Sequence, residues 1–251
     1  MVRAFAHEDG AALVHLHNVS GGLLGGDELG LEVSVGEEAK VQLTTTSATR
    51  IYRAREDSRT TNQQNHIEVG ENALLEYVPD AMIPFAGSRY RQETTIHLAE
   101  GAGLYWWEII GPGREASGEL FEYEQFEMRT KISACGRTIA AENILLSPAK
   151  RNIESLARLG PYRYSATFYI CAVDRKGAAW RIAEEKLRSA TAKLAIPCET
   201  LWGVSTLRSH GLVVRCMARN GGNVLPGLYS IWKQAKALLH CSAAISPRKL
   251  N

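Results

Sequence analysis

One short pattern recurs three times in the first half of the chain and limits the folds that the sequence can adopt. Each copy is a β-like run, a small-residue turn and a second β-like run, and the copies occupy 33–41, 67–75 and 96–104. Aligned on Ala39, Ala73 and Ala102, they lie 34 and 29 residues apart. A strand–turn–strand unit at such a period predicts strands stacked in successive layers, as in a solenoid. The alternative is chance similarity, because glycine and small polar residues dominate all tight turns.

The rest of the sequence extends this β-rich pattern and adds helices only near its C-terminal end. From 2 to 138, apolar and polar residues alternate in short runs separated by glycine-containing turns, which is typical of all-β proteins. Helical spacing of apolar residues runs from Trp180 to Leu194, and a second helix is predicted over 225–241 with Pro226 in its first turn. Since no linker divides the chain, we predict one mainly β domain over 1–251. Its first residues read as the middle of a strand, which suggests a missing N-terminal strand.

A glycine-rich stretch precedes the first of the three repeats. Two Gly-Gly pairs flank Leu23 and Leu24, and Asp27 follows them. This pattern predicts a structural turn in which both leucines enter the core and Asp27 bonds the turn amides. A phosphate-binding loop is the alternative, but the stretch lacks a Gly-Lys-Ser/Thr ending and is followed by strand-like alternation rather than by a helix.

Several motifs occur in a specific order along the first half of the chain. They are GGLLGGD (21–27), LTTTSATRIY (43–52), LEYVPD (75–80), IPFAGS (83–88), WEII (107–110) and GREASGE (113–119) followed by Phe121. In this order the sequence resembles the urease accessory protein family UreD, also called UreH. It departs from the family pattern at Pro112, where an aliphatic residue is more common.

This resemblance implies both a fold and a role. The fold would be mainly β, with layered, right-handed β-helicoid or solenoid-like sheets and about two helices in the C-terminal part. The role would be that of a non-catalytic scaffold or metallochaperone, which assists nickel insertion into apo-urease together with UreF-type and UreG-type (GTPase) partners. No cofactor would be bound tightly, and nickel would be in transit.

Composition restricts the partners and the compartment. The net charge of +2 gives no electrostatic reason to expect nucleic acid or an anionic membrane as a partner. The five cysteines are scattered and form no Cys-x-x-Cys pair, which favours reduced thiols in the cytoplasm. No apolar run approaches membrane-spanning length, and no signal-peptide core is present. We therefore expect a cytoplasmic protein.

Metal-binding candidates are few. His15 and His17 lie two apart on a predicted strand, so both face one side and could bind nickel. The alternative, which we favour, is a partly buried sheet face without metal, because two ligands make a weak site. Among the thiols, Cys135, Cys171 and Cys241 are more simply small core residues. The sequence contains neither a Gly-x-Ser-x-Gly elbow nor a convincing Ser/His/Asp order, so no catalytic residue is predicted.

Carboxylates in apolar surroundings are the other unusual feature. They are Glu76, Glu108, Glu119 and Glu142, with Arg114 and Arg137 as candidate partners. Because a buried carboxylate is costly unless it is paired or hydrated, these acids and Arg114 predict a polar ion path through the β scaffold, or partner contacts. Two alternatives stay open: alternation turns the acids outward into water, or buried pairs fix strand register.

A second functional hypothesis is a β-solenoid-type polysaccharide hydrolase or lyase. It requires a groove with clustered acids and exposed aromatic residues. The strand predicted over 119–132 carries Phe121, Tyr123 and Phe126. However, Phe121 and Tyr123 alternate with Glu122 and Glu124, so the two kinds of side chain face opposite sides. That parity weakens a shared catalytic face.

Overall fold

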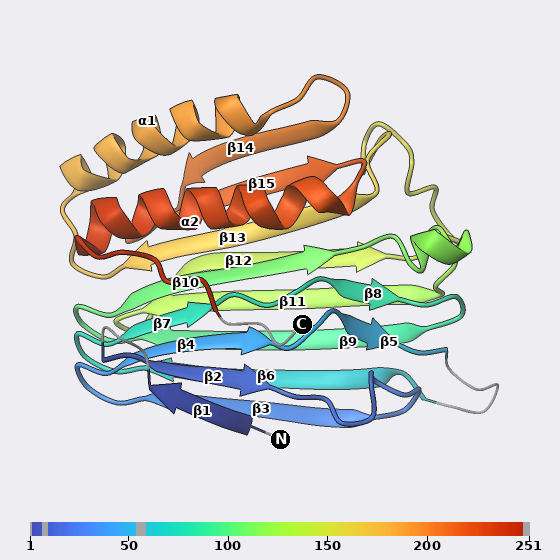
Figure 1. Ribbon diagram of the computed structural model, residues 1–251, viewed down its shortest axis with the longest axis horizontal. Helices are drawn as coiled ribbons and strands as arrows, with labels where there is room; N and C mark the ends of the chain where they lie inside the picture. Colours follow the sequence, from blue (N-terminus) through green and yellow to red (C-terminus); the bar gives the residue numbers. More distant parts are fainter. Residues whose placement is uncertain (1, 7–9, 54–58, 248–251) are drawn as a thin grey trace.

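The computed structural model describes residues 2–6, 10–53 and 59–247, which form two β-sheets with two α-helices over part of one sheet (Figure 1). The larger sheet contains, in the described residues, β1 (Val2–Ala6), β2 (Ala12–Leu16), β4 (Lys40–Thr45), β5 (Thr49–Ile51), β7 (Leu74–Tyr77), β8 (Met82–Pro84), β10 (Gly103–Ile110), β13 (Tyr164–Ala172), β14 (Thr200–Thr206) and β15 (Gly211–Ala218). The smaller sheet contains β3 (Glu28–Val35), β6 (Thr61–Val69), β9 (Arg89–Leu98), β11 (Gln125–Ala134) and β12 (Arg137–Leu146). The helices are α1 (Gly177–Leu194) and α2 (Val224–His240). The prediction of a mainly β chain with two helices in its C-terminal part is confirmed.

Between β2 and β11 the chain passes back and forth between the two sheets. In the larger sheet β2, β4, β7 and β10 pair in parallel, and in the smaller sheet β3, β6, β9 and β11 do the same. The strands β1, β12, β13, β14 and β15 pair antiparallel with their neighbours, so both sheets are mixed. A right-handed helicoid stays a prediction.

The three repeated units form stacked turns that lead from the smaller sheet to the larger one. The backbone N–H of Leu74 donates to the carbonyl of Ala39, and that of Gly103 donates to the carbonyl of Ala73, each at 2.8 Å. Within the third turn Gly101 adopts a φ of 68°, and a Cβ there would collide with Asn72 in the turn below. Each copy is therefore strand, turn and strand, as predicted, and successive turns are hydrogen-bonded to one another.

The glycine-rich stretch before β3 packs against β5. Leu23 N–H donates to Arg50 O and Tyr52 N–H donates to Leu23 O, both at 2.8 Å. A Cβ on Gly22 would lie 2.5 Å from the Tyr52 ring, so only glycine fits this approach. Asp27 Oδ2 accepts from Leu24 N–H at 2.8 Å, as predicted. The prediction that both leucines are buried is wrong for Leu24, which is 51% exposed.

The strand predicted over 119–132 begins later than expected, because β11 starts at Gln125. Phe121 adopts a left-handed φ of 56°, and its N–H donates to Pro112 O at 2.7 Å. Contacts to the preceding loop thus override the alternating pattern of 119–124.

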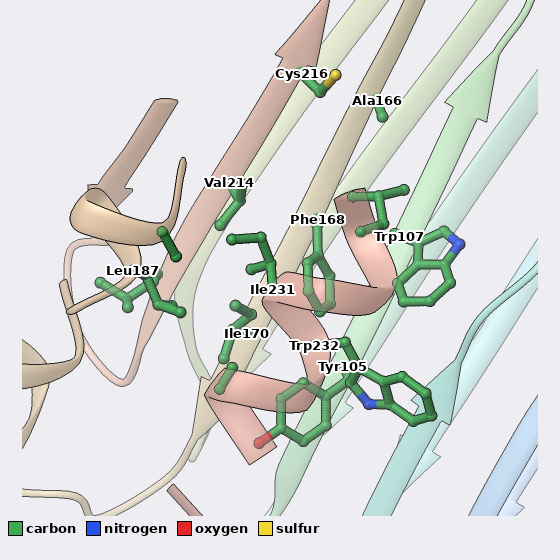
Figure 2. Packing of buried hydrophobic residues seen from close by; sticks show 14 of the residues in the cluster. Tyr105, Trp107, Ala166, Phe168, Ile170, Leu187, Val214, Cys216, Ile231 and Trp232 are labelled. Atoms are coloured by element: carbon green, nitrogen blue, oxygen red, sulfur yellow. The ribbon is translucent and has the colours of Figure 1, made fainter. Parts of the chain in front are cut away.

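Both helices pack on the outer face of the larger sheet at the end formed by β10, β13, β14 and β15 (Figure 1). Figure 2 shows Leu187 of α1 and Ile231 and Trp232 of α2 directed at the strands that carry Trp107, Phe168 and Val214. In α1 the buried apolar positions Trp180, Ala183, Leu187 and Ala190 follow the predicted helical spacing. In the described residues no helix is long and apolar enough to cross a lipid bilayer.

Candidate functional site: a buried polar layer between the sheets

Strand β10 places a carboxylate in the middle of the protein interior. Its odd-numbered side chains Tyr105, Trp107 and Ile109 join the apolar cluster beneath the helices. Its even-numbered side chains face the smaller sheet: Leu104 and Trp106 belong to one inner cluster, and Ile110 belongs to another. Because side chains alternate along a strand, Glu108 lies between the sheets, at the boundary between these two apolar clusters.

Glu108 is bound by uncharged groups of the smaller sheet. Gln92 Nε2 of β9 donates to Glu108 Oε1 at 2.6 Å, and Thr130 Oγ1 of β11 lies 3.4 Å from Glu108 Oε2. Glu108 is only 8% exposed. A carboxylate in this position is oriented by donors from the opposite sheet, but no cation is paired with it among the described residues.

The polar layer continues across the smaller sheet through amide and hydroxyl groups. Tyr90 Oη lies 2.8 Å from Gln63 Oε1 and 2.9 Å from Gln92 Oε1. Thr94 Oγ1 accepts from Asn65 Nδ2 at 3.0 Å and from Gln92 Nε2 at 3.1 Å. These side chains form one connected set, in which the single Tyr90 hydroxyl proton can go to only one of the two amide oxygens beside it.

A small cavity of about 30 Å³ adjoins Glu108. Gln63, Tyr77, Asp80 and Gln92 also line it. An outer cleft of about 430 Å³, near the N-terminal end of α2, shares Asp80 and Ile109 with this cavity. Asp80 therefore lies between the outer cleft and the interior around Glu108.

Burial raises the pKa of Glu108 from its ordinary value of 4.5 to about 7, although the hydrogen bond from Gln92 opposes this shift. The cause is loss of hydration, which disfavours the charged carboxylate. Near neutral pH the protonated and the ionised forms of Glu108 are therefore both populated, and a bound cation could neutralise the ionised form.

Glu142 lies in β12 and is bound by two side chains of the larger sheet. Tyr169 Oη donates to Glu142 Oε2 at 2.7 Å, and Arg215 pairs with Glu142 Oε1. Burial and the neighbouring Glu142 raise the pKa of Tyr169, so it stays a hydrogen-bond donor. The charge of Glu142 also contributes to the raised pKa of Glu108. Both Glu142 and Glu108 are thus bound by side chains of the sheet opposite their own.

Glu76 lies elsewhere, on the helix side of the larger sheet. Its carboxylate accepts from Lys236 Nζ at 3.1 Å and from Trp232 Nε1 at 2.9 Å, both on α2. Burial raises the pKa of Glu76, while the charge of Lys236 opposes that shift. The pair attaches α2 to β7.

Arg114 and Glu119 form an ion pair with each other, in which Arg114 Nε lies 2.9 Å from Glu119 Oε2. Ala86 N–H also donates to Glu119 at 3.2 Å, and the Arg114 guanidinium lies 4.7 Å from the Phe85 ring centre. The pair borders an outer cleft of about 860 Å³, apart from the cavity at Glu108. The structure therefore places Glu108 and Glu142 between the two sheets, where each is bound by side chains of the opposite sheet, and places Glu76, Arg114 and Glu119 elsewhere.

The two metal candidates His15 and His17 have ring centres 6.1 Å apart, and His15 is 2% exposed. Across residues 2–6, 10–53 and 59–247, no group of three or more His, Cys, Asp or Glu side chains is arranged to hold a metal ion. A metal site at this pair stays the less favoured of the two hypotheses. The cysteines are free thiols; Cys171 is buried as predicted, but the prediction of a core position is wrong for Cys135 and Cys241, which are exposed. Burial raises the pKa values of Cys171 and Cys216 to about 12, which makes both unreactive.

Sequence reasoning missed the neutral members of the polar layer and Asp80. Gln92, Thr94 and Thr130 sit at inward positions of strands whose other inward residues are apolar. These polar residues interrupt the apolar pattern of the inward faces, but the sequence reveals the interruption only when the inward face of each strand is known. Asp80 could have been singled out from the sequence, because it is the acid that ends the LEYVPD motif.

The fold and the site define a class: a two-sheet β protein with a helix-covered outer face and a buried polar layer. The chain belongs to the UreD urease accessory protein family, whose model matches residues 1–250. It is similar to the urease accessory protein UreD of Herpetosiphon aurantiacus, with 42% identity over 250 residues that cover 100% of this chain and 87% of the relative. It is also similar to the UreD proteins of Marinobacter nauticus, with 31% identity covering 95% of this chain and 77% of the relative, and of Lachnoclostridium phytofermentans, with 27% identity covering 88% and 78%.

Proposed function

We propose that the protein is a non-catalytic scaffold that assists nickel insertion into apo-urease, together with UreF-type and UreG-type partners, in the cytoplasm. Membership of the urease accessory family supports this role. The free thiols fit a reducing compartment. In this scheme the GTPase partner supplies the energy, and this chain supplies contact surfaces and a path for the ion.

The path we propose runs from the outer cleft past Asp80 to Glu108. The observation that carries it is a buried carboxylate beside a cavity that shares a lining residue with the outer cleft. The cavity volume of about 30 Å³ is room for roughly two water molecules. A fully hydrated divalent ion does not fit, so nickel in transit would exchange most of its water for oxygen ligands such as Glu108 and the amide oxygens beside it.

The test is nickel-dependent urease activation by the complete accessory complex containing Glu108→Gln. Glutamine keeps the size of the side chain and one oxygen that can accept from Gln92 Nε2, but it carries no charge. We expect activation to fall by about tenfold or more, because even the loss of a group that only orients a metal ligand typically costs that much. The matched control is Glu122→Gln, which removes an exposed carboxylate. Unchanged activation by a folded, complex-forming Glu108→Gln protein would rule out this path.

The alternative of a polysaccharide hydrolase or lyase loses its support. Tyr123 and Phe126 are 1% and 0% exposed and belong to an inner apolar cluster, so neither can stack on a sugar ring in a groove. Phe121 packs against the same cluster. Membership of the accessory family replaces this hypothesis.

A further inference from the structure

We propose that His66 and His97 form a second cation site, a two-imidazole site for a divalent transition-metal ion on the outer face of the smaller sheet. This site is separate from the interior around Glu108. It does not depend on the proposed function, because metal binding to it can be measured on the chain alone.

The sheet register brings the two imidazoles together. Strands β6 and β9 pair in parallel, with Glu68 opposite His97 and His66 opposite Thr95. His66 and His97 are therefore diagonal neighbours, and both are exposed. Their ring centres lie 5.6 Å apart. A metal about 2 Å from one nitrogen of each ring places two ring centres roughly 4.5–6.4 Å apart, depending on the angle between the ligands. The observed spacing falls within that range.

Each ring has one nitrogen engaged by a neighbouring oxygen, which leaves the other nitrogen for a metal. His97 Nδ1 lies 2.8 Å from Ser133 Oγ, and that hydroxyl donates to Ile96 O at 3.2 Å. In the tautomer in which the Ser133 hydroxyl donates to Ile96 O, the His97 Nδ1–H donates to Ser133 and His97 Nε2 keeps its lone pair for a metal. His66 Nε2 lies 3.3 Å from Glu68 Oε1, so donation to Glu68 leaves His66 Nδ1 as the ligand atom. Such outer hydrogen bonds orient metal-binding histidines.

The charges around the pair favour a cation. Glu32 of β3 is opposite His66, and Glu68 is opposite His97. Lys131 of β11, opposite Thr95, is the cation on the other side. Two carboxylates against one ammonium leave a negative local balance.

The ligand set selects the kind of metal and the strength of binding. Imidazole nitrogen suits nickel, zinc and copper rather than magnesium or calcium, which prefer oxygen. Two protein ligands leave the remaining positions to water, so the ion stays exchangeable. Such a site suits transient capture of an ion better than permanent storage.

The experiment is titration of the full chain with Ni²⁺, followed by isothermal calorimetry and by the ¹H NMR signals of the histidine rings. We expect paramagnetic Ni²⁺ to broaden the His66 and His97 signals first. His66→Ala and His97→Ala should each lower the affinity by more than the roughly tenfold that losing an outer hydrogen-bond partner of a metal ligand costs. Ser133→Ala should weaken binding less, because it removes only the orientation of His97.

The matched control is Thr95→Ala, on the same outer face and opposite His66, which should leave Ni²⁺ binding unchanged. Equal Ni²⁺ affinity of the wild-type, His66→Ala and His97→Ala proteins would overturn the proposal. So would first broadening at other histidines. Both substituted side chains are exposed, so loss of folding is not expected to obscure the result.

Discussion

Two buried carboxylates on paired strands of the larger sheet, Glu76 and Glu108, differ in whether a cation is paired with them. β7 and β10 are hydrogen-bonded neighbours, yet Glu76 faces α2 and Glu108 faces the smaller sheet. Glu76 has an ammonium group 3.1 Å away. Glu108 is bound by an amide and a hydroxyl, both uncharged.

This difference distinguishes Glu76, whose charge is part of a fixed ion pair, from Glu108, whose charge can change with pH or cation binding. The Glu76 pair is neutral as a unit, so its partner supplies the counter-charge that burial requires. Glu108 has no such partner in the described residues. Because its pKa is about 7, the pH and the presence of a cation decide whether it is protonated, ionised or bound to a cation. Only the second arrangement suits an ion in transit.

The largest expected effect comes from breaking the structural pair. Lys236→Met leaves the Glu76 carboxylate buried without its cation, and we expect the free energy of unfolding to fall by about 3–5 kcal/mol. Urea denaturation measures this loss. The double variant Lys236→Met with Glu76→Gln also removes the isolated charge, so it should recover part of the loss. Equal losses in the single and double variants would show that packing rather than charge pairing fixes α2.

A smaller effect, dependent on pH, is expected at Glu108. Its folded pKa of about 7 exceeds its ordinary value of 4.5, so the folded state holds the proton more tightly than the unfolded state. Stability contributed by this group is therefore present below pH 4.5 and is lost as the pH rises towards and through 7. The difference amounts to about 3 kcal/mol at 1.36 kcal/mol per pKa unit.

Glu108→Gln removes this titration. Relative to wild type, the variant should gain about 3 kcal/mol of unfolding free energy between pH 4.5 and pH 8. Urea denaturation of both proteins across that range measures the difference. Parallel pH profiles of wild type and variant would mean that Glu108 is not desolvated in the folded protein.

The local parts of this arrangement could be predicted from the sequence. The turns at Ala39, Ala73 and Ala102 depend on residues within each unit, and so does the helical spacing of α1. The strand 119–132 was predicted less well, because the backbone of Phe121 is bent by a contact with Pro112 that alternation does not encode.

The contrast between the two carboxylates could not be predicted, although both were named as unusual. Glu76 and Glu108 each have apolar neighbours in sequence, and alternation alone does not say which face of a strand meets a helix. Lys236 lies 160 residues from Glu76, and Gln92 lies on the opposite sheet from Glu108. Only the packing of the sheets and of α2 assigns each acid its partner.

The smallest expected effect on the free energy of unfolding comes from replacing Gln92, the uncharged amide partner of Glu108. Gln92→Met keeps the length of the side chain but removes the 2.6 Å donor to Glu108 Oε1. That donor opposes the rise in the Glu108 pKa, so its loss should raise the pKa further. We expect a loss of about 1–2 kcal/mol in unfolding free energy at pH 8.

At pH 5, where Glu108 is protonated, the Gln92→Met loss should be smaller, because hydrogen bonds to a charged group are the stronger ones. Gln64→Met on β6, an exposed position, is the matched control and should change stability little at either pH. An equal loss at both pH values would assign Gln92 to packing alone. A loss that grows with pH would instead show that Gln92 supports the charged form of Glu108, the form that a passing cation would meet.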